Sequence, residues 1–278
     1  MHKQLLVAAI AVAFPAFAVL NATCLPSGAK AIEPQPVIAE WQQTRVIDAA
    51  VAHQAAAADE KFLYAITNDK IAKYDRKSGE RVALSTSQVA VKHLNSGFFH
   101  EGKLYCAHSN YPRTPERSEI MLLDPATMEI AVFKDFGNFG GSLTWAIKRG
   151  DAWWCNFALY GPKNNETFLV RFDDQWKETG RWVYPAAVIK QIGTASISGG
   201  IWHNDTLLVT DHDHGVLYRL KVPDESRPHK KTPVELEFVG QEKAPFTGQG
   251  IAHDPVTGGL VGINRAKKQI LLVEQIKP

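Results

Sequence analysis

Hydrophobic and polar positions along the chain repeat in one unit. A stretch of small residues leads into an apolar run, a polar turn follows, and a second apolar run ends in a polar residue before a third run begins. The runs are short and rich in Val, Ile, Leu, Tyr and Trp, which favours β-strands, and no convincing amphipathic helix is expected. The spacing of the copies is that of four-stranded β-propeller blades. The five copies cover residues 54–75, 95–124, 140–173, 198–220 and 248–274.

A weaker fourth strand completes most of the predicted blades. It covers residues 80–84, 128–133, 180–185 and 234–240. The fifth copy stops after its third strand, and residues 44–50 can supply the missing outer strand. Pairing the two ends of the chain removes an open sheet edge. The sequence therefore predicts an all-β, five-bladed β-propeller closed by an N-terminal strand, with residues 32–278 as one domain.

Small residues recur at matching places in the predicted innermost strands. Gly97, Gly200 and Gly250 align, with Ala56 in the first copy. Inner strands converge on a narrow axis, where a large side chain would clash. The third copy breaks this pattern around residues 144–145, so its register is left open.

The start of the chain resembles an export signal. Residues 5–20 are apolar and broken by Pro15, after a short polar start, and the run is short for a membrane-spanning helix. Of two small-residue cleavage patterns, the one that ends at Ala31 lies beyond the apolar run. We therefore expect residues 1–31 to be a signal peptide and the protein to be periplasmic or secreted. The alternative is a lipid anchor at Cys24, which would attach the protein to a membrane.

Composition and charge limit the classes of binding partner that we expect. A hydrophobic content of 45% is ordinary for a globular domain, and a net charge of +2 without a basic stripe gives no indication of nucleic-acid binding. Cys106 and Cys155 remain after the signal, and two buried, unpaired residues on strands are preferred over a disulfide. We expect a monomer that binds a small molecule.

Polar residues gather at one predicted face of the ring. In a propeller the start of each inner strand and the end of the second strand meet around the axis, and such a mouth is the default binding site. Most of the residues there can both donate and accept hydrogen bonds, which suits a sugar-like or other small polar ligand. The predicted ligand-binding residues are His53, Gln54, His93, Asn95, Asn156, Tyr160, Ser198, Gln249 and Asn264.

The stretch Asp211-His212-Asp213-His214-Gly215 joins two predicted strands at this face. Turn chemistry explains Asp213 and Gly215 but not the two histidines. A metal is one explanation. Calcium is preferred over zinc because one hairpin cannot supply three zinc ligands, whereas oxygen atoms from Asn156, Asp211 and Asn264 suit calcium. His100, His203 and His253 occupy turns on the opposite face and are expected to be solvated turn residues.

Two motifs resemble known propeller families. The segment 250–263 (GIAHDPVTGGLVGI) and the strand end LLVTD (207–211) resemble the gluconolactonase and senescence-marker lactonases, and PFTGQGIA (245–252) resembles the five-bladed glutamine cyclotransferases. Residues 198–220 with 248–265 are also similar to exported bacterial proteins labelled cycloisomerase. The lactonase resemblance implies a divalent metal held by Glu, Asn and Asp; Asn156, Asp211 and Asn264 match in kind. No Glu occupies an equivalent entry position.

Two functional hypotheses follow. In the first, the protein is a hydrolase or isomerase of lactonase type, acting on a sugar- or lactone-like molecule. His108 or His212 would then be the general base, Asp211 would orient that histidine or bind metal, and Arg265 would hold a carboxylate or stabilise developing negative charge. In the second, the same mouth or an outer face binds a ligand or a protein without catalysis.

Overall fold

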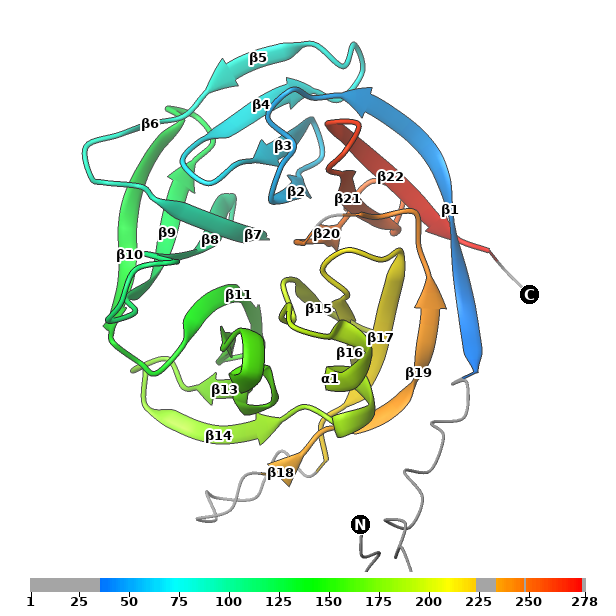
Figure 1. Cartoon of the computed structure of the whole chain (residues 1–278). Helices are drawn as coiled ribbons and strands as arrows, with labels where there is room; N and C mark the ends of the chain where they lie inside the picture. The colour runs from blue at the N-terminus through cyan, green and yellow to red at the C-terminus, as the bar shows by residue number, and fades with distance from the viewer. Residues whose placement is uncertain (1–35, 224–233, 248, 277–278) are drawn as a thin grey trace, which may run out of the picture. The chain divides into compact units, whose positions relative to one another are not determined.

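The computed structural model describes residues 36–223, 234–247 and 249–276. The predicted signal peptide and Cys24 lie outside these residues. The described chain is almost entirely β-structure, arranged as sheets around a common axis (Figure 1). This confirms the all-β propeller.

The sheet pairings divide into five four-stranded units, which we call blades 1 to 5. Blade 1 contains β2 (Ala55–Ala58), β3 (Phe62–Ile66), β4 (Ile71–Asp75) and β5 (Arg81–Leu84). Blade 2 contains β7 (His93–His100), β8 (Lys103–Ser109), β9 (Ser118–Asp124) and β10 (Glu129–Gly137), with β6 (Thr86–Ser87) added at its edge. Blade 3 contains β11 (Ser142–Arg149), β12 (Ala152–Ala158), β13 (Phe168–Phe172) and β14 (Glu178–Val183), with β18 (Val234–Glu235) added.

The last two blades form one continuous sheet because β1 (Val37–Asp48) bridges them. Blade 4 contains β15 (Gly200–His203), β16 (Thr206–Thr210), β17 (Val216–Lys221) and β19 (Glu237–Lys243). Blade 5 contains β20 (Ala252–His253), β21 (Leu260–Asn264), β22 (Gln269–Gln275) and β1.

Strand β1 closes the ring, as the sequence predicts. It pairs antiparallel with β22 from Trp41 opposite Gln275 to Asp48 opposite Gln269. It is longer than the expected residues 44–50, and its first part also pairs in parallel with β19 of blade 4. Strand β1 therefore joins two blades as well as completing one.

The inner strands crowd together at the axis. A Cβ added to Gly250 would lie 2.5 Å from Ala55 Cβ and 2.7 Å from Ser96 Cα, so strands from blades 1, 2 and 5 meet there. A Cβ at Gly200 would lie 2.6 Å from the indole of Trp145. The axial role predicted for these glycines is confirmed. The register left open in the third copy is a real irregularity, because the β11–β12 pairing shifts between Leu143 and Trp145.

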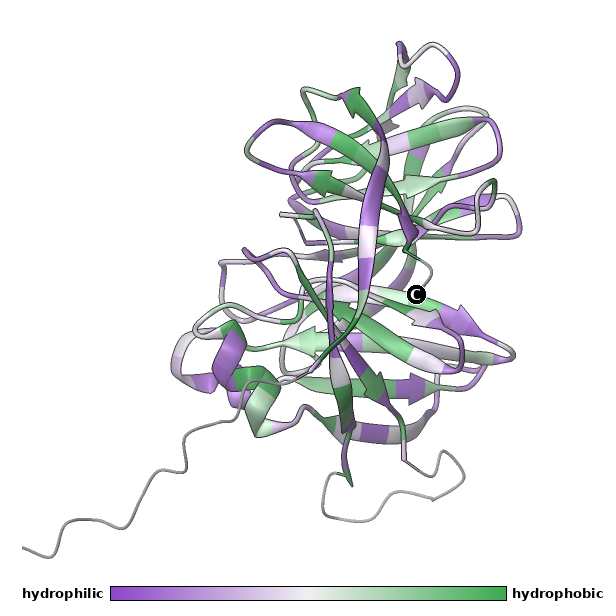
Figure 2. Cartoon of the chain, turned by 90° about the vertical axis from the view of Figure 1, so that its right-hand side faces the viewer, coloured by the Kyte–Doolittle hydropathy of each residue, from purple (hydrophilic) through white to green (hydrophobic). Residues whose placement is uncertain are grey.

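The hydrophobic core lies between neighbouring blades. Trp154 of β12 packs on Trp182 and Trp202 toward blade 4, whereas the adjacent Trp153 packs on Tyr105 of blade 2. Successive strand residues point to opposite faces of a sheet, so one Trp pair fills two interfaces. Seen from the side, the strands carry most of the hydrophobic colour and many turns are hydrophilic (Figure 2).

Three further observations bear on the sequence predictions. Cys106 and Cys155 are buried and unpaired, as expected. The expected absence of helix is wrong at α1 (Ala186–Ile192) and at the 3-10 turn η1 (Gly161–Glu166), two short insertions around blade 3. Within the described residues, no helix has the length and apolar character needed to span a membrane.

Candidate functional site

The predicted mouth forms where the inner strands begin and the second strands end. Ala55 of β2 lies opposite Ile66 of β3, and Ser142 of β11 lies opposite Ala158 of β12. Blades 1 and 5 touch at this level through the isolated bridge between Ala55 and Gly250. The strand pairing therefore brings both predicted sets of polar residues to one face, which we call the axial mouth.

Many of these polar residues hold the blades to one another. Asn95 Nδ2 of blade 2 donates to Leu143 O of blade 3 at 3.1 Å, and Ser96 Oγ donates to Thr144 O at 2.9 Å. Between blades 4 and 5, Thr210 Oγ1 donates to Gln249 O at 2.5 Å. Blade 5 joins blade 1 through Gly250 N, which donates to Gln54 O at 3.0 Å. All of these side chains are buried.

Asn156 is the most fully engaged of the predicted ligand-binding residues. Its Nδ2 donates to Thr144 Oγ1 at 2.8 Å and to Ile197 O at 3.0 Å, and its Oδ1 accepts from Tyr184 Oη at 2.6 Å. The side chain has no exposed surface. Ser198 is also buried and donates to Ser196 O. The geometry of Asn156 is that of a structural clamp.

His108 has both ring nitrogens engaged. Nε2 accepts from Lys92 N at 2.9 Å, and Nδ1 lies 2.9 Å from Glu119 Oε2, to which it donates in this tautomer. Burial lowers the pKa of His108, against the opposing effect of Glu119. Because the Nε2 lone pair is occupied, His108 is not free to accept a proton from a substrate in this arrangement.

The Asp-His-Asp-His turn is organised by Asp211. Its Oδ1 accepts from Asp213 N and His214 N at 3.0 Å each and from His214 Nδ1 at 2.9 Å, while Oδ2 accepts from Tyr218 Oη at 2.9 Å. Asp211 is buried and therefore fixes the turn rather than orienting His212. The partner of His212 is Asp213, whose Oδ1 lies 2.7 Å from Nδ1.

The oxygen atoms predicted to bind metal carry internal hydrogen bonds. Asn156 Oδ1 accepts from Tyr184, Asp211 Oδ1 accepts from the turn that follows it, and Asn264 Oδ1 accepts from Lys267 N at 3.0 Å. Among the described residues, no group of three or more His, Cys, Asp or Glu side chains could hold a metal ion. A divalent cation would have to displace these hydrogen bonds, and the calcium site stays a prediction.

Three basic side chains remain accessible at the mouth. His53 is exposed, whereas His93 and Arg265 are half-buried. Burial, followed by His108, Arg265 and His53, lowers the pKa of His93 to about 4. Burial and Arg265 also lower the pKa of His53. Arg265 Nε donates to His53 O at 2.8 Å, and no ion pair involving Arg265 occurs within the described ranges.

Aromatic and amide groups extend this basic cluster. The ring of His93 lies 5.3 Å from that of Tyr111, which lies 4.6 Å from that of Tyr160. Burial raises the pKa of the Tyr160 hydroxyl, so it is neutral and can donate. Beyond Arg265, Gln249 Nε2 lies 3.0 Å from His212 Nε2. The accessible mouth thus combines His53, His93, Tyr111, Tyr160, His212 and Arg265, and the buried Gln249 contacts His212.

Two buried side chains at the mouth have unused hydrogen-bonding capacity. Gln54 donates through Nε2 to Asn68 Oδ1, but its Oε1 has no partner, and Ser142 Oγ has none either. Gln54 is 2% exposed and Ser142 1%. A buried polar atom left unpaired costs free energy, which indicates a position where water or a ligand group is accommodated.

Sequence reasoning missed two partners, Glu119 and Tyr184. Glu119 lies in a third strand and Tyr184 follows a fourth strand, whereas the polar residues predicted at the mouth came from the first and second strands of each blade. No local motif marks either residue. Their side chains extend inward across the blade to contact His108 and Asn156.

The comparisons support the fold. No protein-family model and no curated protein sequence matches the chain. Glutaminyl cyclase from Myxococcus xanthus is similar in structure, with a TM-score of 0.57 and 10% identity over 87% of this chain and 98% of that one. The Cps50 (Swd1) β-propeller domain from Myceliophteria thermophila has a TM-score of 0.46 and 11% identity, covering 84% and 99%. The likeness to the glutaminyl cyclase is one of fold alone, and the lactonase resemblance stays a prediction.

Proposed function

We propose that the axial mouth binds a small polar molecule that carries an anionic group, of the sugar-acid or lactone-derived type. The observation that supports this most strongly is Arg265, a half-buried guanidinium that is attracted by the exposed Asp213 but makes no ion pair within 4 Å among the described residues. A partly desolvated charge is costly unless it is paired, and a planar guanidinium pairs best with a carboxylate or phosphate. The ligand's anionic group is expected to complete this pair.

The neighbouring imidazoles strengthen the preference for an anion. His93 and His53 are held neutral partly by the positive charge of Arg265. A bound anion would offset that charge, favour the protonated imidazoles and add charge-assisted hydrogen bonds. Binding is therefore expected to take up protons and to strengthen as the pH falls from 7 toward 5.

The polar body of the ligand has partners of its own. Gln249 and Tyr160 border the basic cluster, and the rings of Tyr111 and Tyr160 can lie against the carbon face of a hydroxylated ring. Hydroxyl groups suit the amide of Gln249 because each can donate and accept. This supports the sugar-like ligand predicted from the sequence.

Catalysis at the same site is the second candidate, supported by the His212–Asp213 pair. With Nδ1–H donating to Asp213, His212 Nε2 is the acceptor of the Gln249 amide. A substrate that displaces the Gln249 amide would find an oriented base for water or for a carbon-bound proton. His212 replaces His108 as the base in this version, and Arg265 stabilises the developing oxyanion.

The proposal is tested by calorimetric titration with gluconate, glucose and glucono-lactone at pH 6. We expect gluconate to bind more tightly than glucose and Arg265→Gln to weaken gluconate binding by about tenfold or more. Lys267→Gln is the matched control, because Lys267 is exposed and its backbone, not its side chain, contacts Asn264. Equal binding of glucose and gluconate, or unchanged binding by Arg265→Gln, would contradict the proposal.

A further inference from the structure

The face opposite the axial mouth has a cavity of its own. It measures about 320 Å³ and lies where the inner strands of blades 1, 2 and 5 end. Aromatic and imidazole rings form part of its wall, and its acidic residues come from two turns. Its lining, as far as the described chain shows it, includes neither Lys nor Arg. The rings are those of Phe98, Phe99, His100 and His253, and the acidic residues are Asp59, Glu60 and Glu101.

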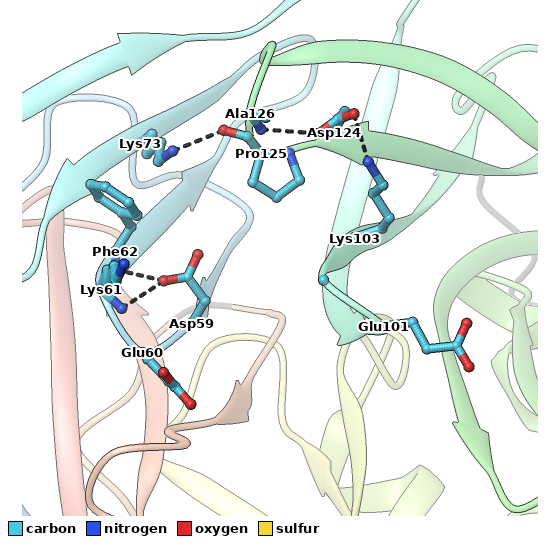
Figure 3. A pocket seen from close by; sticks show the side chains of 11 residues that line it. Asp59, Glu60, Lys61, Phe62, Lys73, Glu101, Lys103, Asp124, Pro125 and Ala126 are labelled. Carbon is cyan, nitrogen blue, oxygen red and sulfur yellow. Dashed lines mark hydrogen bonds and ion pairs between the residues drawn. The ribbon is translucent and has the colours of Figure 1, made fainter.

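The three carboxylates differ in their engagement. Asp59 accepts from Lys61 N, Phe62 N and Tyr64 Oη at 2.6 to 2.7 Å, so it holds the β2–β3 turn. Glu60 has no hydrogen bond or ion pair in the described part of the chain, and Glu101 has one weak contact, 3.5 Å from His100 Nε2. Figure 3 shows Glu60 and Glu101 on opposite sides of the gap between blades 1 and 2. Two carboxylates therefore flank an aromatic wall without a cationic partner.

Of the lysines that line the adjoining gap, Lys73 and Lys103 have other partners, whereas Lys61 follows Glu60 in the same turn and does not line the cavity. Lys103 pairs with Asp124 at 2.6 Å, and Lys73 donates to Pro125 O at 2.8 Å while lying 3.9 Å from the centroid of the Phe62 ring (Figure 3). Their charges are thus directed to other partners. This leaves the carboxylates of Glu60 and Glu101 to attract a cation from outside the chain.

An apolar space adjoins this cavity across Phe98 and His253. A second cavity of about 220 Å³ shares these two residues and continues toward Ile147 and Ile201. The cationic side chains of Lys148 and Arg149 lie on its far side, and Arg149 stacks on Trp202 at 4.0 Å and pairs with Asp205. The charge of the two joined cavities therefore runs from negative at Glu60 and Glu101 to positive at blade 3, with apolar side chains between.

We propose that this opposite face binds an organic cation, an ammonium or guanidinium group attached to an apolar body. The cationic group lies in the aromatic cavity beside Phe98, where cation–π attraction acts on it and the carboxylates of Glu60 and Glu101 attract it from the rim. The apolar body extends past Phe98 toward Ile147 and Ile201. The site is separate from the axial mouth and takes a ligand of opposite charge.

The group can come from a free amine or from a basic side chain of a peptide. The test is titration at pH 7 with phenethylamine, with phenylacetate as a probe of similar shape and opposite charge, and with the blocked dipeptide acetyl-Arg-Phe-amide. We expect phenethylamine or the dipeptide to bind and phenylacetate not to bind. Tighter binding of phenethylamine identifies a free amine as the source, and tighter binding of the dipeptide identifies a peptide.

Variants locate the binding. The double change Glu60→Gln, Glu101→Gln is expected to lower the affinity for the tighter-binding of the two cationic probes by about fivefold or more. The matched double change Glu129→Gln, Glu274→Gln, on exposed positions of β10 and β22, should leave its affinity unchanged, as should Arg265→Gln at the mouth. Binding of phenylacetate as tight as phenethylamine, no binding of either cation, or unchanged binding by the first double variant would overturn the proposal.

Discussion

Trp41 Nε1 donates a 2.7 Å hydrogen bond to Oε2 of Glu242, a carboxylate with no exposed surface. The other oxygen of Glu242 accepts from Arg219 Nε at 2.6 Å. Trp41 lies in the closing strand β1, whereas Glu242 and Arg219 lie in blade 4. The N-terminal strand is thus held by a buried polar group in addition to its backbone ladder, and the carboxylate is satisfied only when the ring is closed.

Replacing Trp41 by Phe tests this closure. The ring remains apolar, but Glu242 Oε2 loses its donor inside the protein, so we expect the free energy of unfolding to fall by about 1 to 3 kcal/mol. Urea titration measures the change. Gln42→Ser, at an exposed position of the same strand, should change it by less than about 0.5 kcal/mol. Equal stability of Trp41→Phe and the native protein would contradict a closing role for the pair.

Asn156→Ala should act on stability. The substitution removes three buried hydrogen bonds, to Thr144, Tyr184 and Ile197, and we expect a loss of about 2 to 4 kcal/mol in the free energy of unfolding. The affinity of the folded variant for gluconate should stay within about twofold, since Asn156 has no exposed surface. A large loss of affinity with little loss of stability would make Asn156 a ligand-binding residue instead.

His93 should make the fold sensitive to acid. Its pKa in the folded protein is about 4, whereas an unfolded histidine has a pKa of about 6.5. The unfolded state therefore binds more protons below pH 6.5, and stability present above that pH is lost as the pH falls toward 4. Between pH 7.5 and 5 this group alone should remove about 1 to 2 kcal/mol. Urea titrations of His93→Gln should show a correspondingly smaller loss than the native protein, and equal losses would contradict this account.

Calcium should not stabilise the protein. The side-chain oxygens of Asn156, Asp211 and Asn264 are engaged in internal hydrogen bonds that a metal would have to replace. Thermal unfolding with chelator, Ca²⁺ or Zn²⁺ should therefore give the same midpoint. A cation bound only by the native state would add about 2.7 kcal/mol at one hundred times its dissociation constant, and an upward shift of that size would restore the metal site.

Much of the fold could be predicted because it rests on local repetition. The recurring strand–turn–strand unit, the small residues at the axis and the outer strand from residues 44–50 all follow from the pattern of side chains. The extra length of β1 could not be seen, since its pairing with β19 depends on backbone geometry at a distance. Helix α1 was missed because its seven residues are too few for a clear helical period.

The site was harder to predict for a physical reason. Alignment of the repeats placed polar residues at one face of the ring. It could not distinguish the side chains that are exposed in the mouth from those that form hydrogen bonds between blades. Asn156 and His212 occupy related strand ends, yet one is clamped by Tyr184 and the other is half exposed. That difference depends on Tyr184, which follows a fourth strand and whose contact with Asn156 cannot be predicted from the spacing of the repeats.

The most direct test of anion binding at the mouth is the pKa of His93 measured by NMR with and without gluconate. The imidazole resonance is assigned by its loss in His93→Gln. A carboxylate bound beside Arg265 should raise this pKa by about one unit or more, because it offsets the positive field that helps to hold the ring neutral. A pKa that stays the same or falls while gluconate is bound would contradict the proposal that the anion occupies the mouth.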